Sequence, residues 1–204
     1  DNSFSDHRYD VFQPFFHYLE LLDHDINTAS IVNWTPINTY LSSIISDFSP
    51  VNSVSDLEVF NDVKNLLLNG DPIDPDVLFL QFDELDIAGH GYGFSPNVEE
   101  YAAKLTVLDS YVSDIHSIIE SKRLIGEDWI FLIVSDHGGD GTSHGDSSNS
   151  YINQTICFVE HPDLEFKMNS LSTQADIVPT ILDFLGVYSD EFDCKTDGNS
   201  LLLN

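Results

Sequence analysis

The chain has 204 residues, of which 42% are hydrophobic, so it is long enough for one domain with a substantial buried core. Its 35 acidic residues against 7 basic ones give a formal net charge of −28, and such a surface repels nucleic acids and anionic membranes. Because it also repels phosphorylated molecules at long range, a site for an anionic substrate would need metal ions to reverse the local field.

The acidic residues are spread along the whole chain, and their excess has two interpretations. One is general solubility, and the other is adaptation to salty surroundings, where self-repulsion is screened. The two cysteines, Cys157 and Cys194, permit one disulfide without requiring it. We recognise no signal peptide, lipidation motif or apolar run of about 18 residues, so membrane insertion is not expected.

Strands and helices alternate along the chain. Ser55 followed by Glu58 is typical of a helix start, and Asn69-Gly70 is typical of a helix end. Pro179 favours a helix that begins just before it. The expected elements are helix 11–22, strand 29–34, helix 55–69, strand 76–82, helix 97–122, strand 129–135, strand 154–159 and helix 172–186. This alternation predicts an α/β fold, with a mostly parallel central sheet and helices on both faces.

The strand over 129–135 ends in Asp136-His137 and two glycines, and His144 follows seven residues later. A short run of this kind, rich in Ile, Val and aromatic residues, predicts a strand that is buried on both faces. Ligands in open α/β sheets bind just beyond the carboxyl ends of such strands. In a turn flanked by Gly138 and Gly139, the adjacent side chains of Asp136 and His137 can both reach one site.

A second acidic and histidine-containing cluster follows the strand over 76–82. Asp86 and His90 bracket a glycine turn there and could close on one ion. The two clusters together supply two carboxylates and three imidazoles, a ligand set suited to zinc or a similar divalent transition metal. The predicted metal ligands are Asp86, His90, Asp136, His137 and His144.

Structural interpretations compete with each of these assignments. A single Asp-His pair usually belongs to an ordinary loop, and it is the presence of two clusters at neighbouring strand ends that favours metal binding. Asp83 and Glu84 would either orient the histidine rings or face solvent. The other histidines have no partner at ligand spacing and are interpreted as surface or core residues: His7, His17, His24, His116 and His161.

The metal motifs resemble those of the alkaline phosphatase superfamily, and within it the type I phosphodiesterase/nucleotide pyrophosphatase group. The matching segments are Asp86-Ile-Ala-Gly-His90-Gly-Tyr-Gly, Asp136-His137-Gly-Gly and Ser143-His144-Gly. The resemblance runs over most of the chain and includes 1–4, 29–34, 175–182 and 197–201. The resemblance implies an alkaline phosphatase-like core, incomplete at its N-terminal side. Residues 1–204 would then be one α/β domain, the C-terminal portion of a catalytic domain.

The function implied by the resemblance is a metal-dependent hydrolase of phosphate esters, of phosphodiesterase or phosphatase type. Asp86, His90 and His144 would hold one zinc ion, and Asp136 with His137 part of a second. Mn²⁺ or another divalent ion is an alternative to zinc. Two ions about 4 Å apart can clamp both oxygens of an in-line displacement at phosphorus. A small phosphorylated substrate, no nucleic-acid polymer, and a secreted or periplasmic location are expected.

The family's Ser or Thr nucleophile has no counterpart in this sequence. In the family this hydroxyl attacks phosphorus, and water then hydrolyses the phosphorylated enzyme. The first strand, a metal-binding Asp and the nucleophile are therefore expected upstream of Asp1, which favours the C-terminal piece of a longer enzyme. A site completed by another chain segment and an incomplete metal centre are the alternatives.

Three other functions stay open. A non-catalytic domain could retain the fold and a partial metal site, and a zinc content below about one ion per chain would favour it. A sulfatase needs a Cys-x-Pro/Ala-x-Arg motif, which neither Cys157 nor Cys194 provides. A metal-dependent phosphoglycerate mutase would need basic residues for two anionic groups, and no basic residue lies beside a metal motif.

Overall fold

Helix α3 (Glu84–Tyr92) and the long helix α4 (Glu99–Leu124) each contribute to both of the units into which the chain divides. The first unit is Asp1–Ala88 with Ala103–Ile118, and the second is Gly89–Ala102 with Ile119–Asn204. The structure is a computed structural model that describes residues 13–22, 25–42, 45–50, 54–167, 172–186 and 197–203. The sequence-based expectations for residues 1–12, His24 and Cys194 lie outside these ranges.

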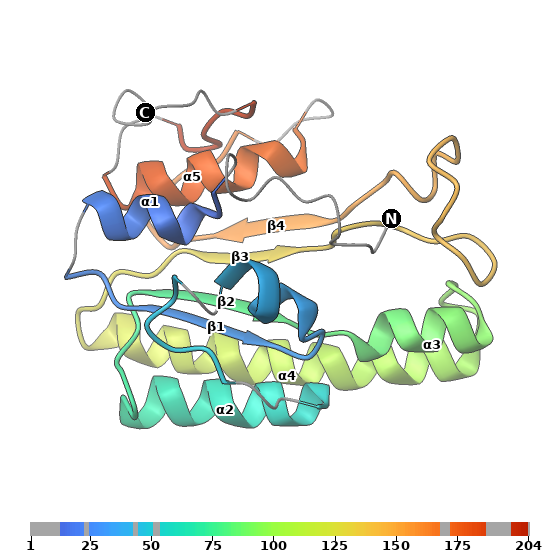
Figure 1. The fold of residues 1–204 in the computed structure, drawn as a ribbon, viewed down its shortest axis with the longest axis horizontal. Helices are drawn as coiled ribbons and strands as arrows, with labels where there is room; N and C mark the ends of the chain where they lie inside the picture. Colours follow the sequence, from blue (N-terminus) through green and yellow to red (C-terminus); the bar gives the residue numbers. More distant parts are fainter. Residues whose placement is uncertain are drawn as a thin grey trace. The chain divides into compact units, whose positions relative to one another are not determined.

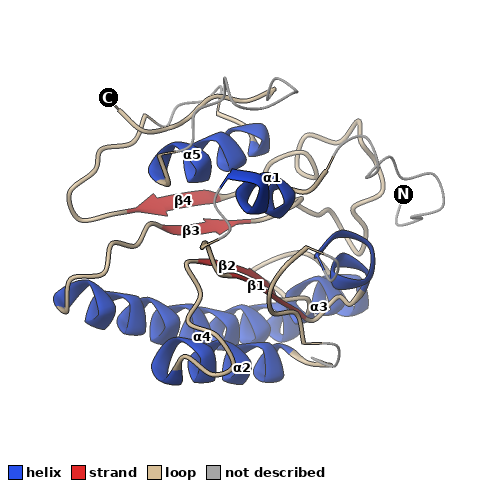
Figure 2. Ribbon diagram, turned by 60° about the vertical axis from the view of Figure 1, so that its left-hand side comes forward, coloured by secondary structure: helices blue, strands red, loops and turns tan. Residues whose placement is uncertain are grey.

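The first unit is built on a parallel strand pair. Strand β1 (Thr28–Val32) pairs with β2 (Val77–Gln81) in register, so that Thr28 lies opposite Val77 and Val32 opposite Gln81. All five residues of β1 are buried. Helices α2 (Asp56–Asn69) and α4 run along one face of this pair (Figures 1 and 2). The predicted α/β class is therefore confirmed, although the sheet is small.

Helix α2 begins and ends where its sequence predicts. The Ser55 hydroxyl accepts a hydrogen bond from the backbone N–H of Glu58 at 3.3 Å. Gly70 adopts the left-handed conformation, with φ at +61°, and donates its N–H to the carbonyl of Leu66. The apolar face of α2 packs inward, and Val59 and Val63 are fully buried.

The other elements of the first unit agree with the sequence in outline. Helix α1 (Phe15–Leu22) is the described part of the predicted helix 11–22. A short π-helix, η1 (Asn38–Ser42), lies in a stretch whose sequence shows no clear pattern. The helix predicted over 97–122 is α4, and no described helix is both long and apolar enough to cross a membrane.

The second unit contains an antiparallel pair, which departs from the mostly parallel arrangement that was predicted. Strand β3 (Phe131–Val134) pairs with β4 (Cys157–Glu160), with Phe131 opposite Glu160 and Val134 opposite Cys157. The connection between them lacks a helix, and parallel strands need a long crossover that is usually helical. The prediction that β3 is buried on both faces is wrong. Among the described strands it pairs with β4 alone, and Val134 is 46% exposed.

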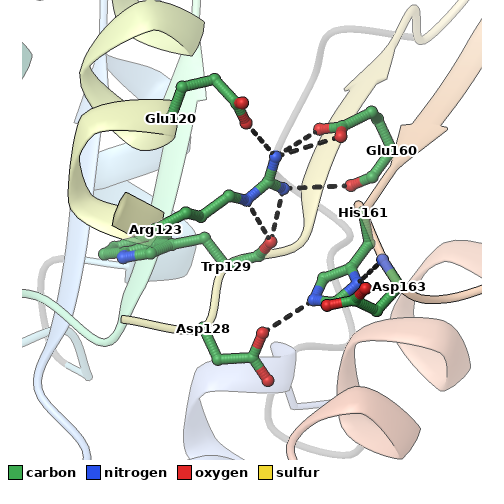
Figure 3. A network of polar contacts seen from close by, with 7 residues as sticks. All are labelled: Glu120, Arg123, Asp128, Trp129, Glu160, His161 and Asp163. Atoms are coloured by element: carbon green, nitrogen blue, oxygen red, sulfur yellow. Dashed lines mark hydrogen bonds and ion pairs between the residues drawn. The ribbon is translucent and has the colours of Figure 1, made fainter. Parts of the chain in front are cut away.

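Arg123 joins the end of α4 to β4 and to the segment just before β3 (Figure 3). Its side chain is 9% exposed, and its guanidinium forms ion pairs with Glu120 and with Glu160, the latter at 2.7 Å. Its Nε also donates to the carbonyl of Trp129 at 3.1 Å. Nearby, the buried ring of His161 contacts Asp128 through Nε2 at 2.7 Å. These contacts make His161 a structural residue, as its sequence context indicates.

The C-terminal helix is fastened by a buried carboxylate. A short 3₁₀ turn, η2 (Gln174–Asp176), leads into α5 (Ile177–Phe184), so the helix does begin just before Pro179. Asp176 accepts the backbone N–H groups of Asn199 and Thr173 at 2.8 and 2.7 Å. These two hydrogen bonds, that of Asn199 first, hold the pKa of Asp176 below its usual range.

Candidate metal centre

The segment that carries Asp86 and His90 is helical, which corrects the prediction of a glycine turn. Strand β2 runs almost directly into α3, which contains both residues (Figure 1). Residues four apart lie on the same face of an α-helix, so the two side chains point to one side of α3. The helix, and not a turn, therefore brings the Asp86 carboxylate and the His90 imidazole together.

The loop that carries His144 is attached to the end of α3 by two hydrogen bonds. The backbone N–H of Phe94 donates to the carbonyl of Gly141 at 2.7 Å. Nδ1 of His90 lies 2.9 Å from the carbonyl oxygen of Thr142. These bonds join Phe94 and His90 to the segment just before His144. They therefore help to position His144 beside the end of α3.

Three imidazole rings gather around one phenylalanine. The rings of His137 and His144 stack, with centroids 3.8 Å apart and planes 18° from parallel. The His90 ring lies 4.8 Å from that of His144. Phe94 lies roughly perpendicular to all three rings, at 5.3 Å from His90, 6.1 Å from His144 and 6.4 Å from His137. The three predicted histidine ligands are therefore neighbours in space.

One carboxylate and two of these rings lie close enough together that they could hold a metal ion. The ligand atoms of Asp86, His90 and His144 all lie within 4.8 Å of one another. Asp86 and His90 share one helix, and His90 and His144 belong to the same unit. One carboxylate oxygen and two imidazole nitrogens are a donor set that zinc and similar divalent ions accept.

Hydrogen bonds at Nδ1 orient two of the rings. A carbonyl oxygen only accepts, so Nδ1 of His90, facing Thr142, must carry the hydrogen. The same holds for His137, whose Nδ1 lies 2.9 Å from the carbonyl of Gly138. In the neutral ring the lone pair is then on Nε2. Such contacts fix the tautomer and orientation of metal-binding histidines in other proteins.

Asp136 lies outside this group of ligand atoms. Its side chain is 88% exposed, and its Oδ1 accepts the backbone N–H of His137 at 3.0 Å. Its Oδ2 lies 3.6 Å from Nε2 of His137, a separation that suits two ligands of one ion. Asp136 and His137 thus form a pair of possible ligands beside the first group.

Gly138 and Gly139 were predicted to allow a turn after His137, but the structure gives a different reason for them. A Cβ at Gly139 would lie 2.2 Å from the ring of Phe94, and a Cβ at Gly138 would lie 2.1 Å from the carbonyl oxygen of Tyr151. Neither has a φ in the left-handed region. The two glycines are therefore needed for close packing.

Gln174 contacts the end of β3, and its sequence context gave no signal of this. Its Nε2 donates to the carbonyls of Ser135 and Asp136, both at 2.7 Å. These two carbonyls immediately precede His137. A single side-chain amide from the start of η2 therefore holds the backbone at the point where the strand leads into the histidine cluster.

Asp83 and Glu84 do not fill the role of ring-orienting partners in the contacts described. The Asp83 carboxylate accepts from the Gln81 amide at 3.1 Å. Glu84 forms an ion pair with Lys104. Glu84 is the first residue of α3 and Asp83 directly precedes it.

A second group of possible ligands combines His116, Glu120 and Glu160. The prediction that His116 has no partner at ligand spacing is wrong, because Glu120 lies one helical turn further along α4. Arg123 already pairs with both carboxylates of this group (Figure 3). The guanidinium supplies the positive charge there, which leaves the Asp86 group as the stronger candidate.

Comparison with known proteins gives matches of two kinds. The family model described as "Type I phosphodiesterase / nucleotide pyrophosphatase" matches residues 8–185. Two fungal proteins named GPI ethanolamine phosphate transferase 1 are similar in an alignment of 113 residues that covers 50% of this chain. The protein of Emericella nidulans is 33% identical and that of Aspergillus fumigatus 36% identical, and the matched parts cover 12% and 11% of their lengths.

Proposed function

Because the chain belongs to the type I phosphodiesterase/nucleotide pyrophosphatase family, we propose that it processes phosphoesters at a divalent metal centre formed by Asp86, His90 and His144. The family and the two fungal relatives support a phosphoester-related activity, of hydrolase or transferase class. The observation that carries the proposal for the metal centre is the convergence of one carboxylate and two imidazoles within 4.8 Å.

The charge of the chain favours a metal-dependent route. A formal net charge of −28 opposes the approach of a phosphate group. When bound, divalent ions would reverse the local field and polarise the phosphoryl oxygens as Lewis acids. The chain's own residues present Asp86, His90 and His144 as ligands, while the hydrogen bond to Thr142 holds the His90 ring in position.

The proposal also includes a second metal ion. Asp136 and His137 would contribute two of its ligands, because Oδ2 and Nε2 lie 3.6 Å apart. The stacking of His137 on His144 places this pair beside the first group. We propose zinc for both positions, with Mn²⁺ as the alternative, and a small phosphorylated molecule as substrate. The nucleophile is not assigned to any residue of this chain.

Metal titration tests the first site. The full-length protein, stripped of metal and titrated with Zn²⁺ in a calorimeter, should bind at least one ion per chain. His90→Ala and His144→Ala should each weaken binding by more than about tenfold, because each removes a direct ligand. The matched control is His116→Ala, which removes a histidine of the other ligand group. Loss of binding in that control, with His90→Ala unchanged, would reject the Asp86 centre. Competition with Mn²⁺ decides between the two metals.

Turnover tests the reaction class. We expect the zinc-loaded protein to cleave bis(4-nitrophenyl) phosphate, and His90→Ala to lower the rate by about a hundredfold or more, while His116→Ala does not. Absence of metal-dependent cleavage in the full-length protein would contradict the enzymatic proposal and favour a domain that binds metal without turnover.

Transfer of ethanolamine phosphate is the second candidate, and the names of the two fungal relatives favour it. Hydrolysis and transfer differ in the group that receives the phosphoryl moiety. Adding an alcohol such as glycerol to the assay would therefore separate them. A hydrolase should release the phosphate monoester in proportion to substrate consumed, whereas a transferase should form a new diester with the alcohol. Mass spectrometry of the products distinguishes the two.

A further inference from the structure

A buried carboxylate from another helix controls how α3 begins. Asp56, the first residue of α2, is only 3% exposed. Its Oδ1 accepts the backbone N–H of Asp83 at 2.8 Å, and its Oδ2 accepts that of Glu84 at 3.1 Å. The first amides of a helix have no partner within the helix. Asp56 therefore supplies from 27 residues away the cap that a helix usually takes from its own N-cap residue.

The contact between the two helices is reciprocal. Oε1 of Glu84 accepts the backbone N–H of Asp56 at 3.3 Å, so each helix start caps the other. Oε2 of Glu84 forms an ion pair with Lys104 of α4. The side-chain amide of Asn33 also donates to Oδ1 of Asp56, at 2.8 Å. The Asp56 carboxylate is thus held by three donors, all in the first unit.

Helix α3 depends on such contacts more than most helices do. It has nine residues, too few for a stable isolated helix, and Gly89 and Gly91 lower its intrinsic stability further. Asp86 lies three residues after Asp83, within the turn whose amides Asp56 binds. A rotation or fraying of this turn would displace the Asp86 carboxylate directly, and would displace His90 through the next turn.

We propose that Asp56 is a positioning residue for the metal centre: it fixes the first turn of α3 so that Asp86 is presented together with His90. This inference rests on the proposed function of Asp86 as a metal ligand. Asp56 itself is not a member of the candidate ligand group. Its charge strengthens two backbone hydrogen bonds, because charge-assisted bonds are stronger than neutral ones.

The test is Co²⁺ binding to the full-length protein with Asp56→Asn. The variant keeps the shape of the side chain, but its NH₂ group must face one of the backbone donors, so the first turn of α3 loses an acceptor. We expect Co²⁺ affinity to fall by about tenfold. We also expect the visible spectrum of the bound ion to change, because it reports ligand geometry. Circular dichroism at the titration temperature verifies that each variant is folded.

Asp47→Asn is the matched control. Asp47 is a partly buried carboxylate in the same unit, and its Oδ2 accepts both the N–H and the hydroxyl of Thr28, at 2.8 and 3.0 Å. This variant should lower stability without changing Co²⁺ affinity or the spectrum. An equal loss of affinity in Asp47→Asn would show a general effect of destabilisation and would overturn the proposal.

Two further variants make the result decisive. If Asp56→Asn does not fold, Asn33→Ala takes its place, since it removes one donor that orients the carboxylate. Wild-type affinity and spectrum in Asn33→Ala would then overturn the proposal.

His90→Ala is titrated in parallel. If His90→Ala binds Co²⁺ like the wild type, the metal centre itself is rejected. If His90→Ala loses Co²⁺ while Asp56→Asn binds normally, only the role of Asp56 is rejected.

Discussion

Phe94 occupies the space that two glycines leave open. A Cβ at Gly89 would lie 2.2 Å from its ring, and a Cβ at Gly139 would lie equally close. The ring therefore packs closely against the backbone of both glycines. The same ring lies against all three imidazoles of the candidate metal centre. At the scale of single residues, the arrangement of the histidines therefore depends on Gly89 and Gly139 having no side chain.

Two alanine substitutions in α3 test this arrangement. Gly89→Ala should lower the free energy of unfolding by about 1–3 kcal/mol, because the new methyl group overlaps the Phe94 ring. Gly91→Ala is the matched control, since nothing lies within 4 Å of its Cβ position. It should raise the free energy of unfolding by about 0.5–1 kcal/mol through helix propensity. Urea denaturation measures both. A Gly89→Ala protein as stable as Gly91→Ala would contradict the packing described for Phe94.

Helices α2 and α3 show which elements the sequence can predict. The cap of α2 is local, because Ser55 and Glu58 are three residues apart, and the helix begins as predicted. The cap of α3 comes from Asp56, and the space for Phe94 comes from Gly89. The Asp56 contact spans 27 residues and is not visible in a window of neighbouring residues, and the glycines alone indicate a turn. This is why a glycine turn was wrongly predicted for the segment that carries Asp86.

The α5 region offers a test at the scale of one element. The pKa of Asp176 is lower in the folded protein than the value of about 3.9 in unfolded chains, because Asn199 and Thr173 donate backbone hydrogen bonds to it. The charged carboxylate therefore stabilises the fold fully above pH of about 4. This contribution is lost as the pH falls below about 4 towards the folded-state pKa.

Asp176→Asn should lower the free energy of unfolding by about 1–2 kcal/mol at neutral pH, as expected for the loss of a cap. The difference from the wild type should shrink as the pH falls below about 4. Urea unfolding at neutral pH, at pH of about 5 and at pH of about 3.5 measures it. Asp109→Asn, at an exposed position of α4, is the control and should show little difference at any pH. A constant difference for Asp176→Asn would contradict the assigned origin of the pKa shift.

At the scale of the whole molecule, charge dominates. The formal net charge of −28 produces self-repulsion that salt screens. The screening length falls from about 10 Å at 0.1 M to about 3 Å at 1 M salt. Ion pairs such as Arg123 with Glu160 relieve the repulsion locally, but only 7 basic residues are present to do so.

Raising NaCl from about 0.1 M to about 1 M should therefore raise the Tm. A gain of about 1 kcal/mol corresponds to about 2–4 °C for a chain of this size. Thermal unfolding followed by circular dichroism measures the shift, with sucrose at equal osmolality as the control for solvent exclusion. A Tm that stays constant or falls with salt would count against adaptation to salty surroundings.

The sequence by itself determined the α/β class, the positions of most helices and strands, and the family. These follow from hydrophobic periodicity and from short motifs, both of which are local. It also singled out His90, His137 and His144, whose rings the structure brings together. Only the tertiary structure decided that Asp86 lies on a helix, that β4 is antiparallel to β3, and that Asp136 is exposed. Those outcomes depend on contacts between residues far apart in the chain, such as Asp56 with Asp83 and Gly139 with Phe94, which no local pattern encodes.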